Sequence, residues 1–336
     1  MAPSVSPSFI VKAGFSTLLL FTIANKIHGR SSMSSLAEEN ASCDSLVGES
    51  AQESFAGEVT HESLLSATME SPRLVGLHDK EGWLAMFDSA AIIEDPVGSP
   101  PSGPDMQARS LFYDTFIAPN NVTLNPVDVN QLPWVAVKRR VVLRSVKIDA
   151  QLPNGAIMRV PVHVVYRFDA RLKAKSLRAH WEVMQNMPVL KTWWDAFPAL
   201  LGATQAFMHI FRVRGLAYTW NYLLGTMLFG AGASEKRKVI EFANAVSAGD
   251  FHAVSNLCSS DAIVALQVQD KDLRPRELGE AGLQRLEASG LRSGGEWVSF
   301  DFTAKINGRQ SSVVGVGVFR FTSDRKIRRA ELYFED

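Results

Sequence analysis

The spacing of apolar residues divides this chain into two stretches with the same order of predicted elements. In each stretch a short helix comes first, and long strands with alternating apolar and polar positions follow. The helices are predicted over residues 79–87, capped by Asp79, and over residues 235–248. Helices that precede a run of antiparallel strands indicate an α+β fold rather than a doubly wound parallel sheet. The strands are predicted over residues 135–148, 156–168 and 174–182, and again over 297–306, 310–321 and 326–334.

This internal repeat is the clearest organisational signal in the chain. Asn154-Gly155 and Asn307-Gly308 occupy matching places between long strands, and Asn-Gly is a typical hairpin turn. We therefore expect two copies of one fold, each a strongly curved antiparallel sheet wrapped on helices. Such a sheet forms a cone whose apolar mouth is a natural ligand site. The second helix is amphipathic and carries on one face Val239, Phe242, Ala243 and Val246.

The first seventy residues differ in composition from the rest. Residues 14–24 are almost all apolar, basic residues flank them, and no acidic residue precedes Glu38. We interpret residues 1–30 as a targeting segment, secretory or organellar; the protein is cytoplasmic if translation starts at Met33. Residues 31–70 contain acidic residues but no lysine or arginine. They are predicted to be a disordered linker, with helix near residues 63–69.

A segment rich in aromatic residues, residues 184–233, connects the two copies. Beyond Ala196 its only charged residues are Arg212 and Arg214. A transmembrane helix is not expected, because the longest uncharged run contains Asn221 and four glycines. Two interpretations remain open. The segment forms helices packed between the copies, or it presents an interfacial apolar face that contacts a membrane peripherally or covers a hydrophobic ligand.

Composition and charge narrow the classes of function. The 336 residues are 46% apolar, which is enough for sizeable cores. Thirty-five basic residues balance thirty-five acidic ones, so no nucleic-acid partner is expected. A short basic run, residues 138–140, is interpreted as the solvated face of a strand. The two cysteines have no metal-ligand spacing, and neither a phosphate-binding loop nor a nucleophile elbow occurs. We therefore expect no metal and no cofactor.

The motif with the most chemical content follows the first predicted helix, in residues 87–101, FDSAAIIEDPVGSPP. Its segment Glu94-Asp95-Pro96-Val97-Gly98 resembles the acid motif of the ketosteroid isomerases, a family of the NTF2-like (SnoaL-like) superfamily. The resemblance continues through Phe112-Tyr113 and the strands at 164–168 and 176–181, and it covers residues 71–182. Residues 235–336 resemble the superfamily more weakly. The implied architecture is two tandem NTF2-like cones with a degenerate second copy.

The resemblance implies that Asp95 moves a proton between carbons of the substrate. A carboxylate held over an apolar pocket can take and return such a proton without a metal, and burial raises its pKa into a useful range. In the family the base works opposite a tyrosine and a protonated aspartate that bind the enolate oxygen. Asp95-Pro96 by itself is also a common turn initiator, so the assignment depends on the surrounding resemblance.

The chain departs from the family at the oxygen-binding positions. The helix tyrosine is replaced by Ser71, beside Pro72, which is expected to break or begin a helix there. The protonated aspartate is replaced by Val164, and a network tyrosine by Phe87. Loss of one oxyanion donor typically costs about 100- to 1000-fold in rate. The last network tyrosine and the pocket tryptophan are matched by Tyr113 and Trp181.

Tyr166 is our candidate for a replacement donor. It lies two residues beyond Val164 and therefore on the same strand face, whereas His163 points to the opposite face and is expected to be structural or exposed. The predicted catalytic residues are Asp95, Tyr113 and Tyr166. The predicted substrate-binding residues are Phe87, Pro96, Phe112, Val164 and Trp181.

The second copy is expected to be non-catalytic. Leu266, Phe242 and Gly317 stand at the positions of the base, the helix tyrosine and the protonated aspartate. The expected domains are thus an isomerase-like domain over residues 71–183, the connector, and a silent domain over residues 234–336 that pairs with the first as an intramolecular pseudo-dimer.

The leading hypothesis is a cofactor-independent isomerase that shifts a double bond in a hydrophobic carbonyl substrate, steroid or polyketide-like. The alternatives are a non-catalytic lipid- or steroid-binding module and a protein-interaction module.

Overall fold

The computed structural model describes residues 58–127, 133–151, 155, 157–182, 193–228, 232–267, 270–308 and 311–334. The side chains of the helical residues 193–203, 227 and 228 are outside this description. The predicted targeting segment and most of the predicted linker therefore lie outside the described residues.

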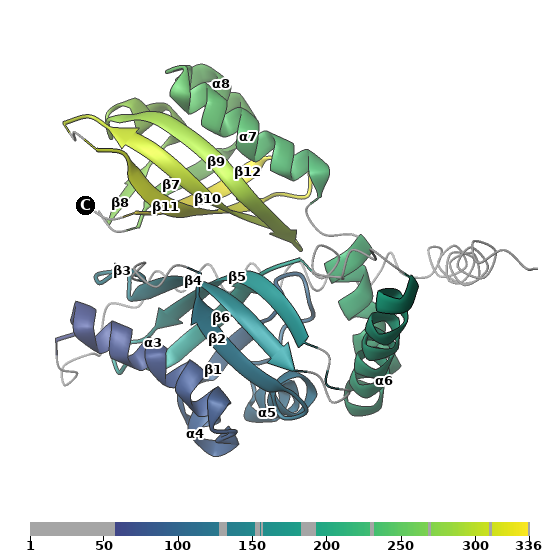
Figure 1. Cartoon of the computed structure of the whole chain (residues 1–336). Coiled ribbons are helices and arrows are strands. Elements are labelled where there is room, and N and C mark those ends of the chain that lie inside the picture. The colour runs from purple at the N-terminus through teal and green to yellow at the C-terminus, as the bar shows by residue number, and fades with distance from the viewer. Residues whose placement is uncertain are drawn as a thin grey trace, which may run out of the picture. The chain divides into compact units, whose positions relative to one another are not determined.

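The first half of the described chain places three helices on one mixed sheet. The helices are α3 (His61–Gly76), α4 (Lys80–Ala85) and α5 (Met106–Phe112), which continues as the π-helical turn η3 (Tyr113–Ile117). The strands are β1 (Phe87–Glu94), β2 (Asn121–Pro126), β3 (Trp134–Ala136), β4 (Val141–Gln151), β5 (Ile157–Phe168) and β6 (Ala174–His180). The strand order is β1-β6-β5-β4-β2, with β3 also paired to β4. In Figure 1 the helices α3 and α4 cover one face of this sheet.

Helix α3 begins at His61, inside the segment predicted to be disordered linker. Thr60 caps it by accepting a hydrogen bond from Ser63 N, and the Ser63 hydroxyl in turn accepts from Thr60 N. The helix continues through Pro72 to Gly76. The prediction that Pro72 would break or begin a helix is therefore wrong. The buried residues of α3 pack on the sheet and stabilise the helix despite the lost backbone donor.

The second half places two helices on a second mixed sheet. The helices are α7 (Ala233–Ser247) and α8 (Phe251–Leu257), with a 3-10 turn, η6, over Pro275–Gly279. The strands are β7 (Cys258–Leu266), β8 (Lys271–Leu273), β9 (Leu283–Gly294), β10 (Trp297–Ile306), β11 (Val313–Phe321) and β12 (Ile327–Phe334). The strand order is β8-β7-β12-β11-β10-β9.

The two sheets share the order of their four central strands. In the first, β1 pairs in parallel with β6, and β6, β5 and β4 follow as antiparallel neighbours. In the second, β7 pairs in parallel with β12, and β12, β11 and β10 follow in the same way. The sequence predicted the antiparallel strands β5, β6, β10, β11 and β12, and its strand 135–148 is divided by a turn into β3 and β4. It missed β1 and β7, which pair in parallel with β6 and β12, and it also missed the antiparallel strands β2, β8 and β9. The fold class is α+β, as expected.

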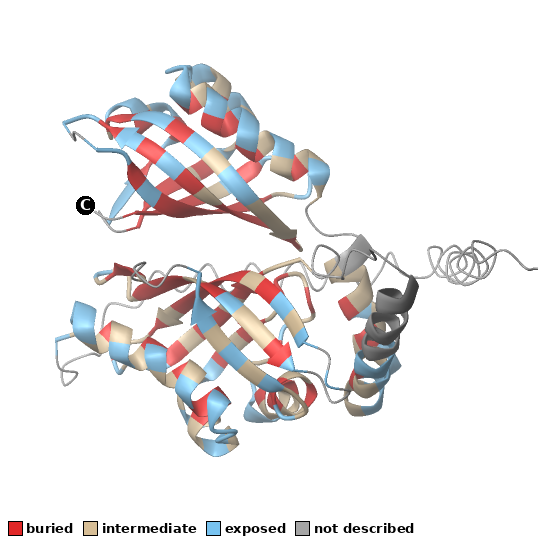
Figure 2. Ribbon diagram, viewed as in Figure 1, coloured by how far each residue is buried: buried red, intermediate tan, exposed pale blue. Residues whose placement is uncertain are grey.

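Each sheet encloses its own apolar core against its helices. We call the first core the first interior: it joins residues of β4 and β5, such as Val142 and Val164, to Trp83 of α4 and Leu64 of α3. The second interior joins α7 to β10, β11 and β12 through side chains such as Phe242 and Phe300. Figure 2 shows α7 with buried residues along one side and exposed residues along the other.

The opposite, outer faces of the strands form a third cluster. Val141, Leu143 and Val165 of the first sheet belong to it, together with Val316 and Val318 of the second. The basic run at residues 138–140 lies in the turn between β3 and β4, so its assignment to a strand is wrong. Arg139 of this turn bonds to Asp270 and Asp272 at 2.8 and 2.9 Å.

The connector forms one long kinked helix, α6 (Trp193–Leu223), followed by a π-helical turn, η5 (Leu224–Leu228). The kink is at Gly215, whose φ of 79° lies in the left-handed region that glycine tolerates. Arg214, directly before the kink, donates to Ala108 O and to Ser102 Oγ, which fixes the end of the first part of α6 to the first half. No helix within the described residues has the length and apolarity needed to cross a membrane.

Candidate functional site

Asp95 directly follows β1 and is partly buried. Its Oδ1 accepts a hydrogen bond of 2.7 Å from Nε1 of Trp181, which directly follows β6. The two residues meet because β1 and β6 are parallel neighbours, so both strands end at the same edge of the sheet. The preceding residue, Glu94, is held on the strand by Arg178 at 2.6 Å. The sequence therefore brings a carboxylate and an indole N–H together at one end of the sheet.

The loop after Asp95 touches two distant segments of backbone. A Cβ on Gly98 would lie 2.3 Å from Gly295 N and 2.8 Å from Gly225 O. Gly98 also has a φ of 93°, which side chains rarely adopt. Gly225 belongs to η5 of the connector, and Gly295 to the turn between β9 and β10. The loop that carries Asp95 is thus in backbone contact with both the connector and the second half.

The surroundings of Asp95 change its acidity in two opposing ways. Removal from water raises the pKa of Asp95 to about 6, and the hydrogen bond from Trp181 lowers it by a smaller amount. A carboxylate with this pKa is ionised at neutral pH and holds a proton more firmly than an exposed aspartate. Asp95 can therefore both accept a carbon-bound proton and give it back.

Three tyrosines interact electrostatically with Asp95, and each has its pKa raised mainly by burial. They are Tyr166 of β5 and Tyr218 and Tyr222 of α6. Tyr222 is 5% exposed, and its ring stacks on Phe116 at 5.8 Å. The two tyrosines of α6 were not singled out from the sequence, since nothing in an aromatic connector shows which residues will face a distant carboxylate. The interpretation in which the connector covers a ligand stays a prediction.

Tyr166 lies beside the residue that replaces the family's helix tyrosine. Its hydroxyl is hydrogen-bonded to Ser71, and Trp83 Nε1 donates to the same serine oxygen at 3.2 Å. Tyr166 is 1% exposed and belongs to the first interior, as strand alternation predicted. Tyr166 of β5 therefore directs its hydroxyl into the first interior, where it meets Ser71 of α3.

Tyr113 is buried in the same core, but its electrostatic partners are different. Its pKa is raised mainly by burial, and the nearby carboxylates are Asp79 and Asp114 rather than Asp95. Its hydroxyl has no hydrogen-bond partner among the described residues. Of the two tyrosines predicted from the sequence to polarise the substrate oxygen, Tyr166 is the one that interacts with Asp95.

The sequence reasoning missed Arg144. This residue of β4 has Val142 and Val146 of the first interior on either side at alternate positions, so its side chain belongs to the same face. It is 6% exposed and interacts electrostatically with Tyr166. The sequence contained a sign of this: Arg144 alternates along the strand with Val142, Val146 and Ile148, so a basic residue occupies a position where an apolar one is expected.

The other predicted residues fall into two groups. Phe87, Phe112 and Val164 are buried members of the first interior. Pro96 is buried in the loop after Asp95, and Trp181 holds that carboxylate as described. Their contribution to substrate binding stays a prediction.

His163 points to the outer face, as predicted from the strand alternation. It is completely buried and contacts Ser299, Asp301 and Arg292 of the second half. Burial lowers its pKa to about 4, so it is neutral at physiological pH. This is the structural role that the sequence suggested.

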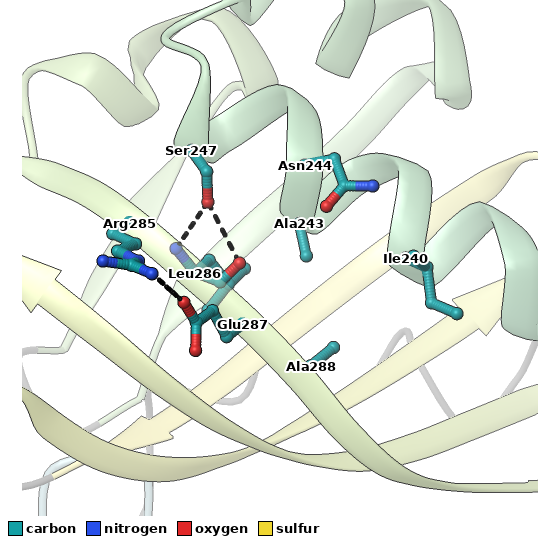
Figure 3. Close-up of a pocket in the computed structure, with 8 residues that line it drawn as sticks. All are labelled: Ile240, Ala243, Asn244, Ser247, Arg285, Leu286, Glu287 and Ala288. Atoms are coloured by element: carbon teal, nitrogen blue, oxygen red, sulfur yellow. Dashed lines mark hydrogen bonds and ion pairs between the residues drawn. The ribbon is translucent and has the colours of Figure 1, made fainter.

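Two surface hollows are present in the second half. The larger, about 480 Å³, lies between α7 and β9, and Ser247, Leu286, Arg285 and Glu287 are among its lining residues. Figure 3 shows that its polar groups bond to one another: Ser247 to the Leu286 backbone and Arg285 to Glu287. Neither hollow is lined by Asp95. Within the described residues, no group of three or more His, Cys, Asp or Glu side chains could hold a metal ion.

Comparison with known proteins gives partial matches to solved structures. No protein-family model matches the chain, and no curated protein does. The Δ5-3-ketosteroid isomerase from Mycobacterium sp. is 27% identical over 37% of this chain and 95% of that chain, with a TM-score of 0.32. A Mycobacterium tuberculosis protein, in complex with estradiol-17β-hemisuccinate, is 26% identical over 36% and 95%, with the same score. A computationally designed 17-OHP binder is 23% identical over 36% and 94%, also at 0.32.

Proposed function

We propose that the first half of this protein is a ketosteroid-isomerase-like enzyme that shifts a double bond in a hydrophobic carbonyl compound, steroid or polyketide-like. Asp95 is the proton carrier and Tyr166 polarises the carbonyl oxygen. The observation that carries the proposal is the Asp95 carboxylate itself. It is partly buried, accepts a hydrogen bond of 2.7 Å from Trp181 Nε1 and interacts electrostatically with Tyr166.

The reaction needs no group beyond these side chains. The Asp95 carboxylate removes a proton from the carbon between the carbonyl and the double bond, and the C–H electron pair forms a new carbon–carbon double bond as the carbonyl becomes a dienolate. Tyr166 donates a hydrogen bond to the enolate oxygen. The protonated Asp95 then returns the proton to the far carbon of the dienolate, and the carbonyl re-forms with its double bond in conjugation. The proton and electron counts are unchanged.

We further propose that the second half is a non-catalytic copy of the same NTF2-like fold, paired with the first as an intramolecular pseudo-dimer. The shared order of the central strands and the joint outer cluster support this. Leu266 ends β7 where Asp95 follows β1, and it is 2% exposed within the second interior. A leucine cannot transfer a proton, so the chemistry belongs to the first half.

The test is an absorbance assay for conjugated-enone formation on a model unconjugated ketosteroid, 5-androstene-3,17-dione. We expect Asp95→Asn to reduce kcat by about 100- to 10,000-fold, because an amide cannot accept the proton. The matched control is Asp261→Asn, which makes the same charge change at an exposed carboxylate of β7 and is expected to leave turnover unchanged.

Turnover that is equal in wild type and Asp95→Asn would reject the proposal. Binding of the ketosteroid without any enone formation by the wild type would instead support the alternative, a ligand-binding module. That alternative is favoured by the replacement of two family oxygen donors by Ser71 and Val164.

A further inference from the structure

Arg144 of the first interior forms no ion pair with a carboxylate of the described residues. Its side chain is 6% exposed, and its cross-strand neighbour is Val164. The adjacent inward positions on its own strand are Val142 and Val146. Its Nη1 has no hydrogen-bond partner among the described residues. A guanidinium does not lose its proton in a protein, so this position carries a buried positive charge.

The other buried arginines have polar partners. Arg320 pairs with Glu296 at 3.3 Å, and Nη1 of Arg109 donates to the backbone oxygens of Ser89, Ala91 and Pro104. A charge removed from water without such a partner is strongly unfavourable, and one side of a buried ion pair alone destabilises the fold. Arg144 is therefore a buried cation to which an anionic ligand could supply the missing partner.

The guanidinium is on the Tyr166 side of the first interior. Arg144 and Tyr166 lie on the paired strands β4 and β5 and interact electrostatically, and Tyr166 interacts in turn with Asp95. The first interior that holds Tyr166 and Arg144 is formed mainly by apolar side chains. A ligand that reaches from Asp95 past Tyr166 meets Arg144.

We infer that the ligand of the first interior is a hydrophobic acid whose carboxylate pairs with Arg144. The two oxygens of a carboxylate match the planar fork of a guanidinium, and two parallel charge-assisted hydrogen bonds form. The apolar body of the ligand then extends past Tyr166 toward Asp95. This deepens the proposed function, on which it rests for the carbonyl group: the substrate class becomes hydrophobic keto acids. A neutral ketone would leave the Arg144 charge unpaired.

The experiment is a calorimetric titration of the full chain with an anionic probe and its neutral ester: 3-oxo-4-androstene-17β-carboxylic acid and its methyl ester. We expect the wild type to bind the acid about 10- to 100-fold more tightly than the ester, the range of a charge-assisted pair. Arg144→Met should remove this preference and leave the affinity for the ester within about twofold. Arg159→Met is the control, since Arg159 of β5 is 69% exposed, and it should keep the preference.

Equal binding of the two probes by the wild type, no binding of the acid, or a preference that survives in Arg144→Met would overturn the inference. Thermal unfolding provides a second measurement. Arg144→Met should be at least as stable as wild type, because it removes an unpaired buried charge, and the acid should raise Tm of the wild type only. A lower Tm of Arg144→Met without ligand would make the arginine structural and would also overturn the inference.

The titrations require no turnover. Failure of the isomerase assay therefore leaves the probe preference measurable, and loss of the preference leaves the assay on a neutral ketosteroid unaffected.

Discussion

The first and second interiors are built on corresponding strands, but the side chains at corresponding positions are polar in the first and aromatic in the second. Val164 of β5 pairs with Arg144 of β4, and the corresponding pair on β11 and β10 is Gly317 with Phe300. Two residues further along, Tyr166 corresponds to Phe319. The further counterparts of Asp95 and Ser71 are Leu266 and Phe242.

The second interior uses these positions for packing. Phe242 and Phe300 each approach Phe319 edge-on, at 4.9 and 5.0 Å between ring centroids. The ring of Phe300 occupies the space next to Gly317, where a Cβ would lie 2.2 Å from it. Among the described residues, the Tyr113 hydroxyl and Arg144 Nη1 of the first interior are buried without hydrogen-bond partners, as is the side-chain amide of Gln267 in the second half. At these positions the second interior has the rings of Phe300, Phe319 and Phe242, and the first has the polar side chains of Arg144, Tyr166 and Ser71. Such groups are typical of a ligand site.

The largest expected effect tests whether the aromatic rings of the second interior are closely packed. Phe300→Ala should lower the free energy of unfolding by about 3–5 kcal/mol, because it removes a fully buried ring and leaves a cavity beside Gly317. Chemical denaturation followed by tryptophan fluorescence measures it, with the exposed Val314→Ala as the control. A loss below about 1 kcal/mol would mean that the second interior is not close-packed.

The second effect concerns the oxygen donor of the first interior. Tyr166→Phe should reduce kcat in the enone assay by about 100- to 1000-fold, the typical cost of one oxyanion donor. Tyr113→Phe removes an equally buried hydroxyl that does not interact with Asp95, so its kcat should stay close to that of wild type. If Tyr113→Phe were the slower variant, the assignment of Tyr166 would be wrong.

The smallest expected effect is a pH dependence of the free energy of unfolding, caused by the titration of Asp95. Its counterpart in the second half, Leu266, does not titrate. The pKa of Asp95 is raised by burial from an ordinary value of 3.8 to about 6, so between these pH values the folded protein binds more protons than the unfolded chain. The stability of the wild type should therefore fall as pH rises from about 4 to 6, by roughly 1–2 kcal/mol for a partly exposed group, whereas Asp95→Asn lacks this loss.

The measurement is the difference in unfolding free energy between wild type and Asp95→Asn at pH 4 and pH 7. The variant should gain stability relative to wild type at the higher pH. The same pKa predicts that kcat/KM of the wild type declines below about pH 6, as the base becomes protonated. A difference independent of pH would show that Asp95 is well solvated.

The sequence predicted those features that depend on local periodicity and on short motifs. The amphipathic face of α7 and the limits of β10 agree with the structure, because apolar spacing and turn residues determine them. The inward direction of Tyr166 and the outward direction of His163 follow from strand alternation alone. The strands β1 and β7 were missed because each starts directly at the end of a helix, without a turn residue between them.

What the sequence could not provide was the meeting of distant segments. Tyr218 and Tyr222, which interact electrostatically with Asp95, lie beyond the bend of α6 at Gly215, next to the bond of Arg214 to Ala108. Helix α3 tolerates Pro72 because its buried face packs on the sheet, which outweighs local propensity. The inward position of Arg144 could have been predicted from strand alternation. That its Nη1 has no hydrogen-bond partner among the described residues could be seen only in the folded structure.

The backbone contacts of Gly98 limit how this protein can be divided. Residues about 130 and 200 positions further along the chain touch the loop that carries Asp95. A fragment that ends after β6 would retain its sheet and its helices and would lose both of these supports. The first half therefore depends on other parts of the chain to support this loop. A shortened protein that keeps this loop supported would have to include the connector and the β9–β10 turn, although neither takes part in the proposed chemistry.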